Sequence, residues 1–337
     1  MNTPSYLKIR RSPKAELHVH LEGTIEPEML FNLAKRNAIS LPYRDLAGLK
    51  AAYHFSSLND FLSIYYTGLK VMVTKQDFYD VTLAYLESAS RENVIHAELY
   101  TSPQSHLERG IPMSTMMDGM LEAIDYALDN FGISAHLIFG LQRHRTEAEA
   151  LDAMDAVLPY RDRIIALGLG GPELGNAPSK FREAFARARD LGWRTTVHAG
   201  EEGPASYIYE ALDVLKADRI DHGVQCESDA ALVQHLSDSK ISLTVCPISN
   251  VKLKVFKTLG EHPLGRLLDA GCRVSVNADD PSYFGANVSD NLHQVSVALD
   301  LNEQQVLTLL RNGFESAFCD DMTRMKYIRV LEHEWLC

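Results

Sequence analysis

The sequence lacks an uninterrupted apolar run long enough to span a membrane, and its N-terminus lacks the charged-then-apolar pattern of a signal peptide. It also lacks an excess of positive charge, because 33 lysines and arginines stand against 45 aspartates and glutamates, giving a net charge of −12. Such a balance disfavours binding to nucleic acid or to an anionic membrane. We therefore expect a cytoplasmic protein that has neither as its main partner.

Cysteine is scarce as well, and no arrangement of it suggests a disulfide framework. The five cysteines are Cys226, Cys246, Cys272, Cys319 and Cys337. They are far apart and odd in number, and none forms a C-x-x-C pair. This usage is typical of a reduced, cytosolic protein. Any zinc site in it must therefore be built from histidines and carboxylates.

What the sequence does contain is a regular alternation of short β-branched runs and segments with helical 3.6-residue periodicity. Strands are expected at 16–23, 94–100, 134–140, 163–168, 194–198, 219–222, 241–246 and 273–277. Helices are expected at 27–37, 77–92, 114–130, 147–158, 180–191, 205–215, 229–237 and 264–270, with further helices from about residue 288 to the C-terminus. No low-complexity linker interrupts the pattern, so we expect one domain over residues 1–337.

Eight strands in alternation with helices predict an α/β fold, a (β/α)8 TIM barrel with additional helices. Each crossover must return the chain to the same end of a parallel sheet, and eight such units close a barrel. A doubly wound open sheet is the structural alternative. No G-x-G-x-x-G follows an early strand, however, and the glycine-rich stretch 168–171 comes too late in the chain to serve as one.

The segment between the first two expected strands allows two interpretations. Residues 46–53 are expected to form a connection, and residues 57–66 an amphipathic stretch that carries Phe61, Tyr65 and Tyr66. Packing of this aromatic face in the core is the default interpretation. The alternative is a flap, because a helix inserted here would lie at the mouth of the barrel, with part of 54–70 lining the pocket.

The stretch 16–23 carries the first indication of chemistry. His18 and His20 are two residues apart on a strand, so both side chains point to the same face. Two neighbouring imidazoles repel each other when both are protonated, and neutral imidazoles are good ligands for a zinc-class metal. The structural alternative is a pair of hydrogen-bonded histidines on a half-buried strand.

Three other strand ends are also rich in ionisable groups. The fifth expected strand ends at His198 and is followed by Glu201, the sixth ends at His222, and the eighth leads into Asp279 and Asp280. In a barrel of this kind the carboxyl ends of the strands form the active face. Since the four clusters would meet at one face, we expect a metal site there.

The residue types predict which side chains do what. His18, His20, His198 and Asp279 form a mixed nitrogen and oxygen ligand set that suits one zinc ion, with iron as an alternative. A bound water would complete the sphere, and the metal would lower its pKa. We expect His222 to orient or deprotonate that water, Glu201 to carry a proton, and Asp280 to accept a hydrogen bond. This set predicts metal-assisted hydrolysis.

These motifs resemble the adenosine/adenine deaminases of the metal-dependent amidohydrolase superfamily, from about residue 14 to beyond the last strand. The resemblance implies a (β/α)8 barrel with one zinc ion at its C-terminal face. It also implies an enzyme that replaces the 6-amino group of a purine with oxygen and releases ammonia. It implies that Glu201 donates a proton to ring N1 and that His222 poises the water. It also implies that Asp280 meets N7 and that the amide of Gly171 reaches N3.

Departures from the usual family pattern indicate the substrate. Glu22 replaces the usual aspartate that meets the ribose, so its extra methylene would push the carboxylate into the sugar space, and that carboxylate can also accept a hydrogen bond from an N–H of a free base. Pro172, Asp221 and the absence of tryptophan from 247–250 are further departures. The combination resembles the adenine deaminase branch. We expect a purine base as substrate, with adenine converted to hypoxanthine and ammonia and adenosine a poor substrate.

Several alternatives stay open or are excluded at this stage. Adenosine or an N6-substituted adenine remains possible as the substrate, and a purine-binding protein without turnover is the non-enzymatic alternative. The cytidine-type deaminases need H-x-E followed by P-C-x-x-C, and only the first half occurs, at 96–98 and 106–108. Sites with a second metal bridged by a modified lysine need a lysine at a strand end, and none is found there. No sequence feature indicates an oligomeric state.

Overall fold

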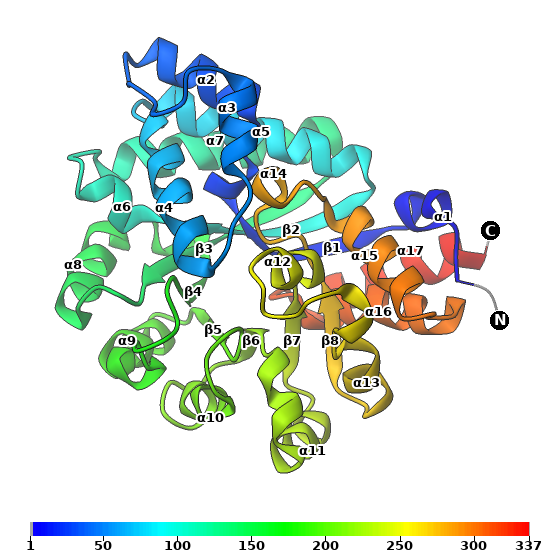
Figure 1. The fold of residues 1–337 in the computed structure, drawn as a ribbon. Helices are drawn as coiled ribbons and strands as arrows, with labels where there is room; N and C mark the ends of the chain where they lie inside the picture. Colours follow the sequence, from blue (N-terminus) through cyan, green and yellow to red (C-terminus); the bar gives the residue numbers. More distant parts are fainter. Residues whose placement is uncertain (1–2, 337) are drawn as a thin grey trace.

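A computed structural model describes residues 3–336 and confirms the predicted TIM barrel. Eight parallel strands follow one another around the barrel in chain order, with the helices outside them (Figure 1). The strands are β1 (Lys14–His20), β2 (Val94–Thr101), β3 (Ser134–Gln142), β4 (Ile164–Gly170), β5 (Arg194–Ala199), β6 (Arg219–His222), β7 (Ser242–Val245) and β8 (Arg273–Val276). The carboxyl ends of all these strands therefore meet at one face of the barrel.

The outer helices bury apolar faces against the strands. Those that follow β1 to β7 are α2 (Pro27–Arg36), α5 (Lys75–Arg91), α7 (Met113–Phe131), α8 (Glu147–Val157), α9 (Arg182–Asp190), α10 (Ala205–Asp213), α11 (Ala230–Ser239) and α13 (Leu264–Asp269). At the C-terminus, α15 (Val288–Ala298), α16 (Glu303–Ser316) and α17 (Asp321–Leu336) complete the shell, and α16 packs on β1 and β8. Both termini lie at this side of the barrel (Figure 1).

Local capping explains where several helices begin. Thr74 and Asp77 form a capping box at the start of α5, as do Thr146 and Glu149 at α8. Helix α11 begins after Asp229, whose side chain accepts two backbone N–H groups. A helix was expected over 180–191, but a 3-10 turn at Pro178–Phe181 comes first and α9 starts at Arg182.

The insertion between β1 and β2 is more helical than expected (blue in Figure 1). Residues 46–53 were expected to be a connection, but they contain α3 (Leu46–Ala52), because the side chain of Asp45 accepts the N–H of Gly48 and caps a helix there. The next helix, α4 (Leu58–Gly68), is capped by Ser57 in the same way. Its aromatic residues pack with Tyr283 and Phe284 of α14 (Pro281–Phe284).

The barrel closes through a short junction between β1 and the segment after β8. The backbone N–H of His20 donates to the carbonyl of Asp279 at 2.9 Å, and the N–H of Asp279 donates to the carbonyl of His18 at 3.0 Å. The side chain of Asn277 accepts the N–H of Leu17 at 2.8 Å. Beyond His20 the chain turns into a 3-10 helix (Leu21–Thr24), so the expected strand over 16–23 ends three residues early.

Residues 3–336 contain neither a membrane-spanning helix nor a disulfide. No helix in this range is long and apolar enough to cross a membrane. Of the five cysteines in the sequence, the four in this range are unpaired thiols, whereas Cys337 lies outside the described residues.

A buried ion pair lies inside the barrel. Arg219 of β6 donates to Glu98 of β2 at 2.7 Å, and neither side chain is more than 1% exposed. Arg219 also donates to the backbone carbonyls of Ser316 and Leu17, both at 3.2 Å. Burial raises the pKa of Glu98, but the charge of Arg219, together with His96 and the hydrogen bonds from both side chains, outweighs burial and holds that pKa at about 2. The carboxylate is therefore ionised in the folded protein.

We expect Glu98→Gln to lower the free energy of unfolding by about 3–5 kcal/mol at neutral pH, because it leaves the Arg219 guanidinium buried without its charged partner. Urea unfolding followed by circular dichroism measures this loss.

The pH dependence provides the control. Because the folded pKa of Glu98 is depressed from 4.5 to about 2, its stabilisation is complete above pH 4.5 and is lost as the pH falls toward 2. The stability difference between parent and variant should shrink over that range. A difference that does not vary with pH would contradict this account.

Candidate metal site and purine pocket

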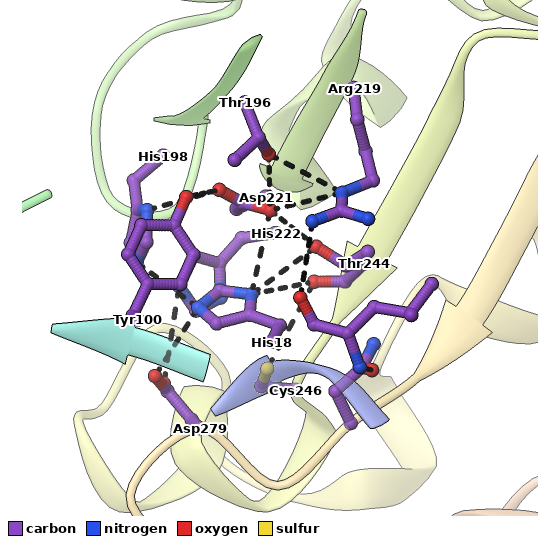
Figure 2. Close-up of polar contacts among 12 residues, drawn as sticks. His18, Tyr100, Thr196, His198, Arg219, Asp221, His222, Thr244, Cys246 and Asp279 are labelled. Carbon is purple, nitrogen blue, oxygen red and sulfur yellow. Dashed lines mark hydrogen bonds and ion pairs between the residues drawn. The ribbon is translucent and has the colours of Figure 1, made fainter. Parts of the chain in front are cut away.

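Four side chains converge at the carboxyl face of the barrel (Figure 2). Nε2 of His198 lies 3.0 Å from Nε2 of His18 and 3.2 Å from Nε2 of His20. Oδ1 of Asp279 lies 3.4 Å from Nε2 of His18 and 3.3 Å from Nε2 of His20. Ligand atoms about 2.0–2.1 Å from one tetrahedral zinc ion are about 3.3 Å apart. These four distances suit neighbouring ligands of one metal ion. By the proximity of their ligand atoms, the side chains fall into two overlapping groups, one of His18, His198, His222 and Asp279, and one of His20, Asp279 and Asp280.

The second nitrogens of the rings support the same interpretation. Nδ1 of His18 lies 3.1 Å from the carbonyl of Thr244, an acceptor only, so Nδ1 carries a hydrogen. Burial lowers the pKa of His18, but the charges of Asp279 and Asp221 outweigh it and raise that pKa, so a cation that binds at Nε2 displaces a proton from the ring. Burial lowers the pKa of His198 to about 4, with the His18 charge as the next cause, so His198 is neutral. Burial raises the pKa of Asp279, but His18 and His20 outweigh it and hold that pKa well below its usual range. Neutral imidazoles and an ionised carboxylate are the forms that bind a metal.

The expected catalytic residue His222 lies beside these four residues, at a greater distance. Its Nε2 is 3.7 Å from Oε2 of Glu201 and 4.0 Å from Oδ2 of Asp279. Burial, followed by the charge of His18, holds the pKa of His222 well below its usual value. Both His222 and Asp279 have positive φ angles, 61° and 66°, in the left-handed region that non-glycine residues adopt uncommonly. The neutral imidazole can accept a proton from a water in the cavity.

Glu201 lies in a loop that one buried carboxylate holds in place. Both oxygens of Glu173 accept backbone N–H groups, from Gly200, Glu201, Glu202 and Gly203, at 2.6–3.0 Å. Burial, followed by the negative charges of Asp279 and Glu173, raises the pKa of Glu201 well above its usual value. Its Oε1 is buried and has no hydrogen-bond partner among the described residues. Glu201 is therefore a protonated acid with an unused polar atom at the cavity.

Asp280 is the second carboxyl group of this kind. Burial and the neighbouring Asp279 raise its pKa well above the usual value, and its Oδ1 also has no partner within residues 3–336. Its position depends on Gly23, because a Cβ added there would lie 1.9 Å from Oδ1 of Asp280. The protonated Asp280 can donate a hydrogen bond as well as accept one.

These residues line one cavity at the carboxyl face. His20, His198, Glu201, His222, Asp279 and Asp280 share it with Gly171, whose φ of +97° lies in the region that favours glycine. Helix α4 supplies Leu58, Phe61, Leu62, Tyr65 and Tyr66 to the wall. Residues of 57–66 therefore line the cavity, as the flap interpretation expected, and the same aromatic residues pack in a core cluster with α14, as the default interpretation expected.

Glu22 lies behind the cavity wall. It is 2% exposed and is absent from the residues that line the cavity within the described chain. Its Oε1 accepts the N–H of Ser102 at 2.9 Å and lies 3.0 Å from Nε2 of His106, and its Oε2 accepts the Tyr65 hydroxyl at 3.1 Å. Glu22 therefore does not face the cavity, although the sequence predicted a direct contact between Glu22 and the substrate. Glu22 instead holds Tyr65 and Ser102, which do line the cavity.

Sequence reasoning missed several supporting residues. Glu173 and Asp221 were noticed only as part of departures from a family pattern, although each contacts a functional segment. Ser249 donates to Oδ2 of Asp279 at 2.6 Å, and Asn250 lies 3.4 Å from Nδ1 of His222. Their position directly after β7, at the carboxyl face, was the available signal.

Comparisons with known proteins agree with this site. The family model described as adenosine deaminase matches residues 13–333. An adenine deaminase from Cupriavidus taiwanensis is 48% identical over 328 residues, which cover 97% of this chain and 93% of that protein. The crystal structure of an adenine deaminase from Arthrobacter aurescens has a TM-score of 0.94 at 44% identity, covering 96% of this chain and 99% of that one. A Burkholderia ambifaria amidohydrolase with bound Zn has a TM-score of 0.90 at 26% identity, covering 98% and 92%.

Replacement of one ligand tests the metal site. We expect His198→Ala to lower the bound metal by at least about tenfold after dialysis, because three donors remain where four converge. Elemental analysis of the purified protein measures it. The matched control is His235→Ala, which removes an exposed histidine of α11. Equal metal content in both variants would refute the proposed ligand set.

Proposed function

The chain belongs to the adenosine deaminase family, and from this premise we propose that it hydrolyses adenine to hypoxanthine and ammonia, with adenosine a poor substrate. The protein is a metal-dependent hydrolase of the deaminase class. The observation that carries the adenine proposal is the pair of unpartnered carboxyl oxygens, on Glu201 and Asp280, that face a cavity beside the metal ligands. Two protonated acids match the acceptor nitrogens on the two edges of a purine ring.

We propose zinc as the metal, held by His18, His20, His198 and Asp279. Three imidazoles and one carboxylate form a borderline ligand set that suits zinc, and the amidohydrolase from Burkholderia ambifaria carries Zn. A bound zinc ion supplies Lewis acidity that lowers the pKa of a water molecule toward neutrality. Ser249 supports the site, because its hydroxyl donates a hydrogen bond to Oδ2 of Asp279, so that Oδ1 faces the histidines.

Glu201 is proposed as the acid that protonates ring N1. Its raised pKa keeps the proton on the carboxyl, and Glu173 fixes the loop that carries it. Protonation of N1 weakens the aromatic character of the N1=C6 bond, so C6 becomes open to attack by water oxygen. His222, neutral and 3.7 Å from Glu201, takes a proton from that water as its oxygen bonds to C6. His222 then gives this proton to the amino group, which leaves as ammonia, while the ionised Glu201 takes the remaining hydroxyl proton and the C6=O bond forms.

The remaining contacts are proposed to orient the ring. Asp280 donates a hydrogen bond to N7, and the backbone N–H of Gly171 donates one to N3, since both residues line the cavity. Purine nitrogens lack hydrogens at these positions and therefore need donors. An analogue without those acceptors would leave buried polar atoms unpaired, and such sites reject analogues strongly.

We propose that Glu22 favours base over nucleoside indirectly. Its carboxylate holds the hydroxyl of Tyr65 and the backbone of Ser102 at the cavity wall. Helix α4 thereby closes the side of the pocket on which a sugar would extend. A shorter aspartate at position 22 would not span His106, Ser102 and Tyr65 together, so α4 would be less firmly held.

Other properties are proposed on general grounds. The chain is proposed to fold as one domain, since the family match runs from residue 13 to 333 without a break. The unpaired thiols Cys226, Cys246, Cys272 and Cys319 and the net charge of −12 favour a cytoplasmic location without nucleic acid or a membrane as partner.

A substrate comparison tests the proposed function. We expect kcat/KM for adenine to exceed that for adenosine by at least about 100-fold, because the Glu22-held wall excludes the sugar. Ammonia release from adenine, adenosine and N6-methyladenine, with metal analysis of the same sample, measures it. A preference for adenosine or the N6-substituted base would contradict the proposal.

The matched variant for this comparison is Glu22→Asp. It should lower the adenine-to-adenosine ratio by about tenfold or more, and Tyr65→Phe, which removes one of the same hydrogen bonds, should move the ratio in the same direction. An unchanged ratio in both variants would show that Glu22 has no part in the choice of substrate.

Glu201→Gln tests the proton donor. We expect retained metal and a loss of kcat by roughly 10²–10⁴-fold, because the amide cannot give a proton to N1. In the parent, kcat/KM should fall as the pH rises through the raised pKa of Glu201, since only the protonated acid is active. Stopped assays across pH measure both effects, and Glu202→Gln, one residue along the same loop, is the control. Near-parental activity in Glu201→Gln would rule out this role.

A further inference from the structure

Asp221 lies in the barrel interior beneath the metal ligands and takes no part in the mechanism above. It is the third residue of β6, and its side chain is fully buried. In Figure 2 its carboxylate lies among Thr196, Tyr100, Thr244 and the ring of His198.

Hydroxyl groups fix the orientation of this carboxylate. Thr196 and Thr244 each donate a hydroxyl to Oδ1 at 2.7 Å. The hydroxyl of Tyr100 donates to Oδ2, and Nε of Arg219 lies 3.8 Å from Oδ1. Because all of these partners are donors, they stabilise the ionised form of Asp221 and leave it little freedom to rotate.

The same carboxylate faces two of the metal-ligand rings from the side away from the metal. Its Oδ2 lies 3.3 Å from Nδ1 of His198, and its Oδ1 lies 4.0 Å from Nδ1 of His18. A negative group at Nδ1 keeps the hydrogen on that nitrogen, so Nε2 presents its lone pair to the metal. Among the described residues, Nδ1 of His198 makes no hydrogen bond, so the Asp221 carboxylate at 3.3 Å is the polar group that faces it, whereas Nδ1 of His18 also lies 3.1 Å from the carbonyl of Thr244.

The charge balance of the interior points the same way. Glu98 and Asp221 share one guanidinium, that of Arg219, whose shortest ion pair is with Glu98 at 2.7 Å, whereas its Nε lies 3.8 Å from Oδ1 of Asp221. Asp221 therefore receives only part of that positive charge. Asp221 adds to the attraction for the cation without touching it.

We propose that Asp221 is a positioning residue for the metal site, which orients His198 and His18 through their Nδ1 atoms and thereby tightens metal binding. The inference rests on the proposed ligand set. Carboxylates that support metal-bound histidines in this way typically change metal affinity by about 10–100-fold.

The test is the zinc dissociation constant of Asp221→Asn, measured by competition with a chromogenic chelator. The asparagine has nearly the same size and loses only the charge. We expect zinc to bind about 10–100-fold more weakly than in the parent. The absorption spectrum of the cobalt(II)-loaded protein should also change, because it reports the geometry of the ligands. Parental affinity together with a parental cobalt spectrum would overturn the proposal.

Glu98→Gln is the matched control, because it removes one charge from the same interior and the same arginine but contacts neither His198 nor His18. We expect its zinc affinity to stay within about threefold of the parent, since its carboxylate is not a partner of the ligands. An equal loss in both variants would mean that Asp221 acts only through general stability, which would also overturn the proposal.

Two further measurements keep the outcome interpretable. If Asp221→Asn does not fold, Tyr100→Phe removes the hydroxyl that donates to Oδ2 while leaving the charge in place. It should weaken zinc binding in the same direction by a smaller factor, and unchanged binding would count against Asp221. His198→Ala distinguishes failure of the ligand set from failure of the role of Asp221. If His198→Ala binds zinc as tightly as the parent, the proposed ligand set is wrong. If His198→Ala loses zinc affinity and Asp221→Asn does not, only the role of Asp221 is refuted.

Discussion

The site depends on the hydrogen bonds that close the barrel. His20 and His18 bond through their backbones to Asp279, so the junction between the first strand and the segment after the last strand is made by three of the four candidate ligands. Barrel closure and ligand placement are therefore the same structural event. The positive φ of Asp279 turns its side chain back toward the histidines at this junction. A sheet that stayed open at this edge would separate His18 and His20 from Asp279.

Burial then divides the carboxyl groups of the site into two kinds. Asp279 and Asp221 face histidines and hydroxyl donors, and these partners outweigh the cost of burial, so the pKa of each lies well below its usual value. Glu201 and Asp280 lie among other carboxylates, so burial and negative charge raise the pKa of each. We propose that the ionised pair serves the metal and that the protonated pair serves the ring nitrogens of a purine. Residues of one chemical type thus take opposite roles because their neighbours differ.

Much of the fold could be predicted from the sequence because its signals are local. The alternation of β-branched runs with helical periodicity fixed the strand count, and the polar residues after His198, before His222 and around Asp279 marked the active face. The helix at α3 was missed because its start depends on one cap, Asp45, in a segment without clear periodicity.

The contacts behind the site could not be predicted in this way. Glu22 bonds to Ser102 and His106, about 80 residues away in the chain, and Asp221 meets Tyr100 and His198 only inside the closed barrel. No local sequence pattern predicts contacts between residues so far apart in the chain. Glu22, which the sequence predicted to contact the substrate, therefore holds helix α4 in place. Asp221, noted in the sequence only as a departure from the family pattern, is the strongest candidate for support of the metal ligands.

The most direct test of the central claim is a crystal structure of the zinc-loaded protein with hypoxanthine, with anomalous scattering recorded at the zinc edge. The account predicts one zinc ion at about 2.0–2.2 Å from His18, His20, His198 and Asp279. It also predicts the purine ring with N1 beside Glu201 and N7 beside Asp280. Zinc bound elsewhere, or a ring whose nitrogens face neither carboxyl group, would contradict it.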